Sequence, residues 1–128
     1  MKILGIGVDI IKNSRVKSFI RNKDFIKRTF GKKEIKTSLK LVSKTNFFAK
    51  RFAAKESFAK AIGTGFRNNL NFKDIEILND KLGKPYYFKS KKIDNIINKK
   101  FKVKKYDLFL SISDEKDYSV AFTILQKQ

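Results

Sequence analysis

Cysteine and histidine are absent from this sequence, and acidic residues are scarce. Without cysteine, neither a disulfide nor a thiolate metal site can stabilise the fold, which is compatible with a reducing cytoplasm. Without histidine, no side chain has an ordinary pKa of about 6.5. Only 12 aspartates and glutamates oppose 31 lysines and arginines, which gives a net charge of +19. The few carboxylates are therefore the residues whose positions most need an explanation.

Long apolar runs are also missing. The first eleven residues, MKILGIGVDII, are apolar over a few positions only and are interrupted by Asp9. A membrane-spanning helix needs about 20 apolar residues, and a signal peptide needs a longer apolar region and a small-residue cleavage site. We expect a soluble, cytoplasmic protein.

The positive charge attracts anionic partners, such as nucleic acid, an anionic membrane, phosphorylated metabolites or an acidic protein. Of the 31 basic residues only five are arginine, whereas bidentate recognition of phosphate or guanine favours arginine. The many lysines, asparagines and isoleucines also fit an AT-rich coding bias. The charge alone therefore does not identify the partner.

Length and composition predict one globular domain over residues 1–128. The chain is 41% hydrophobic and contains 13 phenylalanines, enough for a core. Apolar periodicity predicts strands where residues alternate and helices where they recur every three or four positions. The predicted strands are 2–8, 72–78, 85–88, 106–113 and 118–125, and the predicted helices lie within 13–30, 31–45, 46–62 and 90–101. The fold class is α+β, a mainly antiparallel sheet packed with helices.

The helix over 46–62 has the clearest pattern. Asn46 is predicted to cap its start, and Gly63 is suited to a left-handed residue at its end. Phe48 and Phe52 precede Glu56 on roughly the same face. Glu56 is therefore expected to be only partly exposed, and such a carboxylate requires a cation or hydrogen-bond donors.

Two glycine motifs do not match nucleotide-binding signatures. Gly5-Ile6-Gly7 lacks the third glycine of the dinucleotide fingerprint, because position 10 is isoleucine. Gly63-Thr64-Gly65 follows a helix and is not followed by Gly-Lys-Ser/Thr, so it is not a P-loop. Taken alone, the second motif reads as the end of a helix.

Asp9 and Glu56 each have two interpretations. Glu56 and Lys60 can form an exposed helical ion pair, and Asp9 can end a strand or cap the next helix. Alternatively, the two carboxylates converge to bind a hard cation. Mg²⁺ is typically held by one or two carboxylates together with phosphates and waters.

Four segments occur in an order that resembles a known family. They are GIGVDI near the start, FAAKESFAKAIGTG at 52–65, GKPYY at 83–87, and SIS followed by DYSVAF in the last hairpin. Together they closely resemble the holo-acyl-carrier-protein synthases, which are small bacterial 4′-phosphopantetheinyl transferases. The resemblance extends from about Ile3 to Leu125, and FAAKESFAKAIGTG is its most specific part.

The resemblance implies an α+β enzyme that transfers the phosphopantetheine group of coenzyme A to a serine of apo acyl-carrier protein. Such enzymes use Mg²⁺, release adenosine 3′,5′-bisphosphate and support fatty acid biosynthesis. Small members are usually homotrimers with active sites between subunits, and no nucleic acid or membrane partner is implied. The matching residues are Asp9 and Glu56 for metal, Lys60 for phosphate and catalysis, Gly63, Thr64, Gly65, Lys84 and Pro85 for coenzyme A, and Arg15 for the acidic carrier.

Several questions stay open at this level. The base that takes the serine proton is Glu56, acting through water, or Lys60. The family commonly has a histidine where this chain has Asp114, so its role is not transferred to Asp114. Weaker coenzyme A binding, or substitution by a nearby lysine, could follow. A non-catalytic family member and a small nucleic-acid-binding protein are the alternative interpretations.

Overall fold

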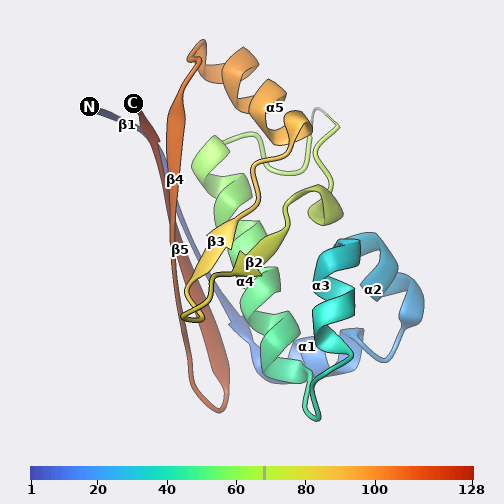
Figure 1. The fold of residues 1–128 in the computed structure, drawn as a ribbon. Coiled ribbons are helices and arrows are strands. Elements are labelled where there is room, and N and C mark those ends of the chain that lie inside the picture. The colour runs from blue at the N-terminus through green and yellow to red at the C-terminus, as the bar shows by residue number, and fades with distance from the viewer. Residues whose placement is uncertain (68) are drawn as a thin grey trace.

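The computed structural model describes residues 1–67 and 69–128, with a sheet covered on one side by helices (Figure 1). Three antiparallel strands form this sheet in the order β1 (Lys2–Lys12), β5 (Tyr118–Lys127) and β4 (Tyr106–Asp114). The long helix α4 (Thr45–Ile62) packs directly on the sheet. The predicted α+β fold with a mainly antiparallel sheet is therefore confirmed.

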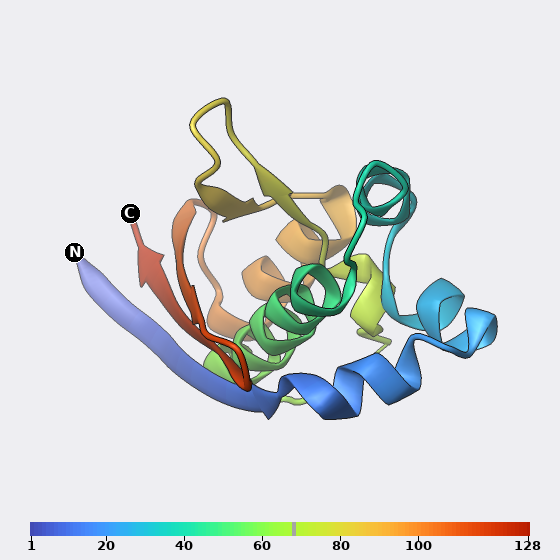
Figure 2. The ribbon, with the colours of Figure 1, turned by 90° about the horizontal axis from the view of Figure 1, so that it is seen from below.

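The shorter helices lie on the same side of the sheet as α4 (Figures 1 and 2). The region predicted to be helical within 13–30 contains two of them. Asn22 caps one of these, because its Oδ1 accepts the backbone N–H of Asp24 at 2.8 Å. None of the helices in the described residues has the length and apolar character needed to cross a membrane. The shorter helices are α1 (Asn13–Phe19), α2 (Lys23–Thr29), α3 (Lys32–Ser38) and α5 (Lys91–Phe101).

A second, two-stranded sheet lies beside the first. Its strands β2 (Ile77–Asn79) and β3 (Pro85–Tyr87) are antiparallel. The Asp80 Oδ1 accepts the backbone N–H of Lys84 at 2.9 Å and so closes the turn between them. Figure 2 shows this hairpin extending away from the helices. A 3-10 turn, η1 (Phe72–Asp74), precedes it.

Two glycines let α4 approach β1 closely. A Cβ atom on Gly5 would stand 1.8 Å from the carbonyl oxygen of Ala61, and one on Gly7 would stand 1.9 Å from that of Ser57. Any side chain at either position would force the helix away from the strand. The motif at residues 5–7 therefore has a packing role, which the comparison with nucleotide-binding signatures did not reveal.

A buried ion pair joins α4 to α3. The side chains of Lys55 and Glu34 are fully buried, and Lys55 Nζ lies 2.7 Å from Glu34 Oε1. Lys55 also donates to the backbone oxygens of Phe72 and Ile75. Burial lowers the pKa of Lys55 and raises that of Glu34, and each partner's charge opposes the shift. The pair ties α4, α3 and the segment before β2 into one unit.

The face of the sheet opposite α4 is apolar and is not covered by any helix in the described part of the chain (Figure 1). Ile6, Val8 and Ile10 of β1 are each more than half exposed there. Phe122 is paired with Val8 across the strands and is 40% exposed, and Phe109 on β4 is 50% exposed. An exposed apolar surface of this kind is typical of an interface with another protein.

Three predicted details of the elements are wrong. The first strand does not end at Asp9 but continues to Lys12, because β5 pairs with it along its whole length. Asn46 does not cap α4, which begins at Thr45, and its side chain donates to Asp114 instead. The strand predicted over residues 72–78 is shorter and begins later. Residues 72–74 form η1, and the strand β2 covers only Ile77–Asn79.

Candidate active site

The contact between β1 and α4 brings the two singled-out carboxylates together. Asp9 lies two residues after Gly7, on the face of β1 that packs against α4. Glu56 immediately precedes Ser57, whose carbonyl lies against Gly7. Both side chains are half-buried. Asp9 and Glu56, with Lys60 and Arg15, are called the carboxylate site below.

The pKa shifts of Asp9 and Glu56 agree with their proximity. Burial raises the pKa of the Glu56 carboxyl above its ordinary value, and the charge of Asp9 raises it further. Burial also raises the pKa of Asp9, although the hydrogen bond from Lys60 and the charges of Lys60 and Arg15 oppose the rise. Two partly desolvated like charges favour either a proton or a cation between them.

Lys60 contacts Asp9 rather than Glu56. Lys60 Nζ lies 3.2 Å from Asp9 Oδ1 and 3.0 Å from the carbonyl oxygen of Val8. Within the described residues, Lys60 thus forms its ion pair with Asp9 rather than with Glu56. No hydrogen bond or ion pair in that part of the chain engages the Glu56 carboxylate. Glu56 remains available for a ligand.

These residues suit a hard cation that keeps some of its own ligands. Asp9 and Glu56 provide oxygen donors of the kind that Mg²⁺ prefers, and Glu56 lacks a protein partner in the described residues. The described residues contain no group of three or more acidic, histidine or cysteine side chains arranged for a metal. A cation held here would therefore be completed by water and by phosphate oxygens.

The predicted coenzyme A residues lie in two separate places. Gly63 and Gly65 have positive φ values of 84° and 62° and form the turn that ends α4, with Thr64 between them. Lys84 and Pro85 lie in the β2–β3 hairpin, far from that turn (Figures 1 and 2). One chain alone does not bring the two sets together.

Two lysines of α5, which the sequence analysis did not single out, lie beside the turn after α4. Thr64, Ile96, Lys99 and Lys100 line a cavity of about 620 Å³. Lys100 Nζ donates to the carbonyl oxygen of Ile62 at 2.5 Å and so satisfies the end of α4. The lysines in the helix predicted over residues 90–101 were the signal present in the sequence.

Asp114 lies at the end of β4, outside the carboxylate site. Its Oδ2 accepts a hydrogen bond from Asn46 Nδ2 at 3.0 Å, in the first turn of α4. Asp114 also lines a cavity of about 300 Å³ with Ile10 and Tyr118 on the exposed side of the sheet. An amide donor thus engages this carboxylate.

The chain is similar over nearly its whole length to proteins of one family. Residues 5–123 match the family described as the 4'-phosphopantetheinyl transferase superfamily. A relative from Pelagibacter ubique named holo-[acyl-carrier-protein] synthase is 59% identical over 128 residues, which is 100% of each chain. The crystal structure of holo-[acyl-carrier-protein] synthase from Neisseria meningitidis is 35% identical and has a TM-score of 0.87, over 98% of this chain and 99% of that one. A holo-(acyl-carrier-protein) synthase from Bacillus anthracis in complex with CoA (3',5'-ADP) is 34% identical, with a TM-score of 0.83 over 100% of both chains.

Proposed function

Because the chain belongs to the 4'-phosphopantetheinyl transferase superfamily, we propose that it transfers the 4′-phosphopantetheine group of coenzyme A to a serine of apo acyl-carrier protein. The observation that carries this proposal is the meeting of Asp9, Glu56 and Lys60 where β1 packs on α4. The site combines oxygen donors for a cation with an ammonium for phosphate. The relative that is 59% identical bears the name of this activity.

The reaction exchanges one phosphorus–oxygen bond for another. The serine oxygen attacks the β-phosphorus of the coenzyme A diphosphate, and the bond from that phosphorus to the bridging oxygen breaks. Adenosine 3′,5′-bisphosphate leaves, and the serine proton passes to a base. Because the reacting groups carry much negative charge, catalysis depends on positioning and charge neutralisation.

Asp9 and Glu56 would hold Mg²⁺, which neutralises charge on the diphosphate when it is bound. Lys60 lies next to Asp9 and would stabilise the charge that develops on the departing bisphosphate. The left-handed turn at Gly63, Thr64 and Gly65 follows Lys60 by one helical turn. We assign the adenosine end of coenzyme A to that side.

We assign the role of proton acceptor to Glu56. Lys60 Nζ already donates to Asp9 Oδ1 and to the carbonyl oxygen of Val8, which commits it as an ammonium donor. The Glu56 carboxylate has no such partner among the described residues. The carboxylate oxygen that does not hold Mg²⁺ can therefore receive the serine proton through a water.

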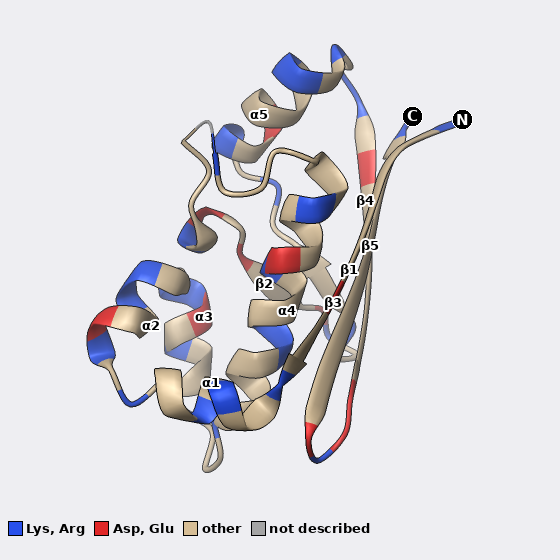
Figure 3. Ribbon diagram, turned by 180° about the vertical axis from the view of Figure 1, so that it is seen from behind, with Lys and Arg blue, Asp and Glu red and all other residues tan. Residues whose placement is uncertain are grey.

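The carrier protein is proposed to dock on α1 and α2. Figure 3 shows lysines and arginines along both helices, and acyl-carrier protein is acidic. Arg15 is exposed on α1, and its charge lowers the pKa of both Asp9 and Glu56 against the larger effect of burial. Arg15 is thus near enough to the carboxylate site to orient the partner's serine toward it.

The proposed assembly is a homotrimer with active sites between subunits. The exposed apolar face of the sheet supplies a surface for self-association. The separation of Lys84 and Pro85 from the turn at residues 63–65 gives a reason for it, because a neighbouring subunit could bring its hairpin to that turn.

Phe122→Lys should convert the assembly to monomers, because it puts a charge in the middle of the apolar face. Sedimentation velocity at several protein concentrations would measure the change. Leu39→Lys is the matched control, since Leu39 is 70% exposed at the end of α3, on the helical side of the sheet. A wild-type protein that is monomeric at all concentrations would contradict the proposed assembly.

Intact-mass spectrometry tests the proposed function directly. The protein, coenzyme A and Mg²⁺ should add one phosphopantetheine group to an apo acyl-carrier protein and release adenosine 3′,5′-bisphosphate. Chelation of Mg²⁺ should stop the transfer. A carrier that stays unmodified after long incubation with ample Mg²⁺ would overturn the proposal.

A further inference from the structure

Three buried hydroxyl groups lie together between α4, β3 and β5. Thr123 Oγ1 is 2.6 Å from Ser57 Oγ and 2.7 Å from the hydroxyl oxygen of Tyr87. The Tyr87 hydroxyl also donates to the carbonyl oxygen of Ala54 at 2.7 Å. Ser57 and Thr123 are fully buried, and Tyr87 is 6% exposed. Ser57, Tyr87 and Thr123 are called the hydroxyl cluster below, and no step of the proposed reaction uses them.

One assignment of protons satisfies the whole cluster. Tyr87 donates to the Ala54 carbonyl, Thr123 donates to the Tyr87 oxygen, and Ser57 donates to Thr123. Burial raises the pKa of Tyr87 above its ordinary value, although the hydrogen bonds with Ser57 and Thr123 oppose the rise. The Tyr87 hydroxyl therefore stays protonated near neutral pH. The cluster is a fixed set of hydrogen bonds and not a store of protons.

The hydroxyl cluster lies where α4 contacts the sheet. Gly7 of β1 and Thr123 of β5 are partners in the strand register. Ser57 contacts both members of this pair. Its carbonyl oxygen would be 1.9 Å from a Cβ atom on Gly7, and its hydroxyl bonds to Thr123. Ser57 thereby places α4 over one particular pair of residues in the sheet.

The rest of this contact restrains the helix less specifically. Ala61 lies against Gly5, and Ala121 of β5 is fully buried. Contacts between apolar groups are non-directional, whereas hydrogen bonds restrict both distance and angle. Among the described residues, the other side-chain hydrogen bonds from α4 to this sheet come from Asn46 and Lys60 and are exposed. The hydroxyl cluster is therefore the buried restraint that fixes where along β1 the helix lies.

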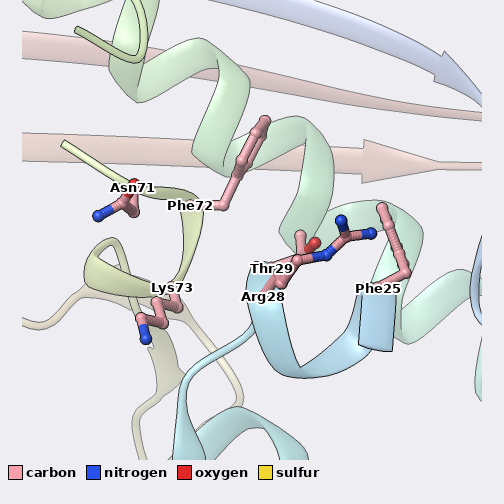
Figure 4. A pocket seen from close by; sticks show the side chains of 6 residues that line it. All are labelled: Phe25, Arg28, Thr29, Asn71, Phe72 and Lys73. Atoms are coloured by element: carbon pink, nitrogen blue, oxygen red, sulfur yellow. The ribbon is translucent and has the colours of Figure 1, made fainter. Parts of the chain in front are cut away.

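The side of α4 away from the sheet is packed less closely. A pocket of about 500 Å³ lies there between α2 and η1, and Phe25, Arg28 and Phe72 are among its lining residues (Figure 4). A helix that borders free space on one side takes its position mainly from the other side. The contact with the sheet thus decides where the side chains of α4 stand.

The carboxylate site depends on the same contact. Glu56 directly precedes Ser57 on α4, and Asp9 follows Gly7 by two residues on the same face of β1. A shift of α4 along β1 would therefore change the distance between the two carboxylates. Mg²⁺ requires a nearly ideal octahedral arrangement of its ligands. Even a small shift should weaken its binding.

We propose that the hydroxyl cluster is a positioning element that holds Glu56 at the distance from Asp9 at which the two carboxylates bind Mg²⁺. The hydroxyls are buried and act through the backbone of α4. Tyr87 belongs to β3, so the cluster also ties the hairpin that carries Lys84 to the helix that carries Glu56. This inference rests on the proposed function, since it assumes that the carboxylate site binds Mg²⁺.

Tyr87→Phe and Thr123→Val each remove one hydroxyl and keep the shape of the side chain. The ring at position 87 can still pack on Phe58, whose centroid is 5.1 Å away. Each variant should raise the Kd for Mg²⁺ about tenfold, the effect expected when a group that orients a metal ligand is lost. Titration calorimetry without coenzyme A would measure it. Thr123→Ser retains the hydroxyl and should keep the wild-type affinity.

Transfer assays separate positioning from general destabilisation. In Tyr87→Phe and Thr123→Val, the Mg²⁺ concentration that gives half-maximal transfer should rise by the same factor as the Kd. The KM for the carrier should not change, because the carrier is proposed to dock on α1 and α2. Ser57→Ala is a third variant if either of the others does not fold, since alanine favours the helix.

Tyr106→Phe is the matched control. Tyr106 is 4% exposed, and its hydroxyl donates to Asp94 on α5. This variant also loses a hydrogen bond from a buried tyrosine, so its urea midpoint should fall, but its affinity for Mg²⁺ should equal that of the wild type.

Three results would overturn the positioning role. The first is an unchanged Mg²⁺ affinity in folded Tyr87→Phe and Thr123→Val, even if both are less stable. The second is equal weakening by Thr123→Val and Thr123→Ser, which would assign the effect to packing. The third is a loss of affinity in Tyr106→Phe as large as in Tyr87→Phe. A wild-type protein that binds no Mg²⁺ and modifies no carrier would overturn the proposed function as well, whereas normal transfer with an unaltered Mg²⁺ requirement in the variants would overturn the positioning role alone.

Discussion

Glu56→Gln is expected to lower kcat by about 10²- to 10³-fold, the size of loss seen when one preorganised charge-stabilising group is removed from an active site. The amide retains the shape of the side chain and one oxygen. It loses the negative charge that would help to hold Mg²⁺ and the basicity that would accept the serine proton. Intact-mass measurement of carrier modification under single-turnover conditions would give the rate.

The same substitution should not destabilise the fold. Burial raises the pKa of Glu56 in the folded protein, so folding disfavours its ionised form. The corresponding contribution to stability is present at low pH and is lost as the pH rises through the raised pKa. At neutral pH a neutral amide should therefore leave the unfolding free energy unchanged or slightly higher.

Glu115→Gln is the control for charge, because Glu115 is exposed in the β4–β5 turn. Its rate should equal that of the wild type. Calorimetric Mg²⁺ binding, measured without coenzyme A, should be weakened by Glu56→Gln and not by Glu115→Gln. Full activity of the Glu56→Gln variant would remove Glu56 from both of its proposed roles.

Lys55→Met should lower the unfolding free energy by about 3–5 kcal/mol, since it leaves the buried carboxylate of Glu34 without its main cation. The carbonyl oxygens of Phe72 and Ile75 would also lose a donor. The nearest remaining positive group to Glu34 is Arg51, whose Nε is 4.0 Å away. Urea denaturation at neutral pH would measure the loss.

A more exposed ion pair with the same N–O distance shows whether the loss of stability comes from burial or from pairing alone. Lys92 Nζ lies 2.7 Å from Asp74 Oδ2, but the lysine side chain is 37% exposed. Lys92→Met should therefore cost only about 0–1 kcal/mol. Adding Glu34→Gln to Lys55→Met should recover part of the loss, because the neutral amide removes the unpaired buried charge. The recovery should be partial, since Gly31 and Ile77 donate to different oxygens of Glu34 and the amide has only one. Equal losses for the two lysine variants would contradict the role of burial.

Much of the architecture could be predicted from local patterns. The helix predicted within residues 90–101 has Ile93, Ile96, Ile97 and Phe101 at helical spacing, and α5 has Ile93 and Ile97 buried against the core. Gly63 predicted the end of α4. These features depend on periodicity and backbone conformation within a few residues, which a sequence records directly.

The interior charges could not be predicted in this way. Lys55 belongs to a lysine-rich sequence and has no pattern that distinguishes it from an exposed residue, yet its side chain is fully buried. Its partner Glu34 is 21 residues earlier in the chain. Only the packing of α3, α4 and the segment before β2 against one another makes a buried position for both.

The carboxylate site, too, could be predicted only in part from the sequence. The motif around Glu56 indicated a phosphate-handling helix, and its resemblance to a family indicated that Asp9 belongs with it. The structure brings the two carboxylates near each other because Gly5 and Gly7 allow α4 to lie against β1. It also pairs Lys60 with Asp9, whereas helical spacing had offered a pair with Glu56 as one of two interpretations.

The sequence by itself determined the kinds of elements, their order and the family to which the chain belongs, because these follow from local periodicity and from motifs read along the chain. Only the tertiary structure decided which face of each strand is internal. On β5 the small residues Ser119, Ala121 and Thr123 face α4, while Phe122 is exposed. A period of two residues defines two faces without distinguishing them. The close approach of the helix leaves room only for small side chains at Ser119, Ala121 and Thr123, whereas Leu125, farther along the same face, is a buried core residue.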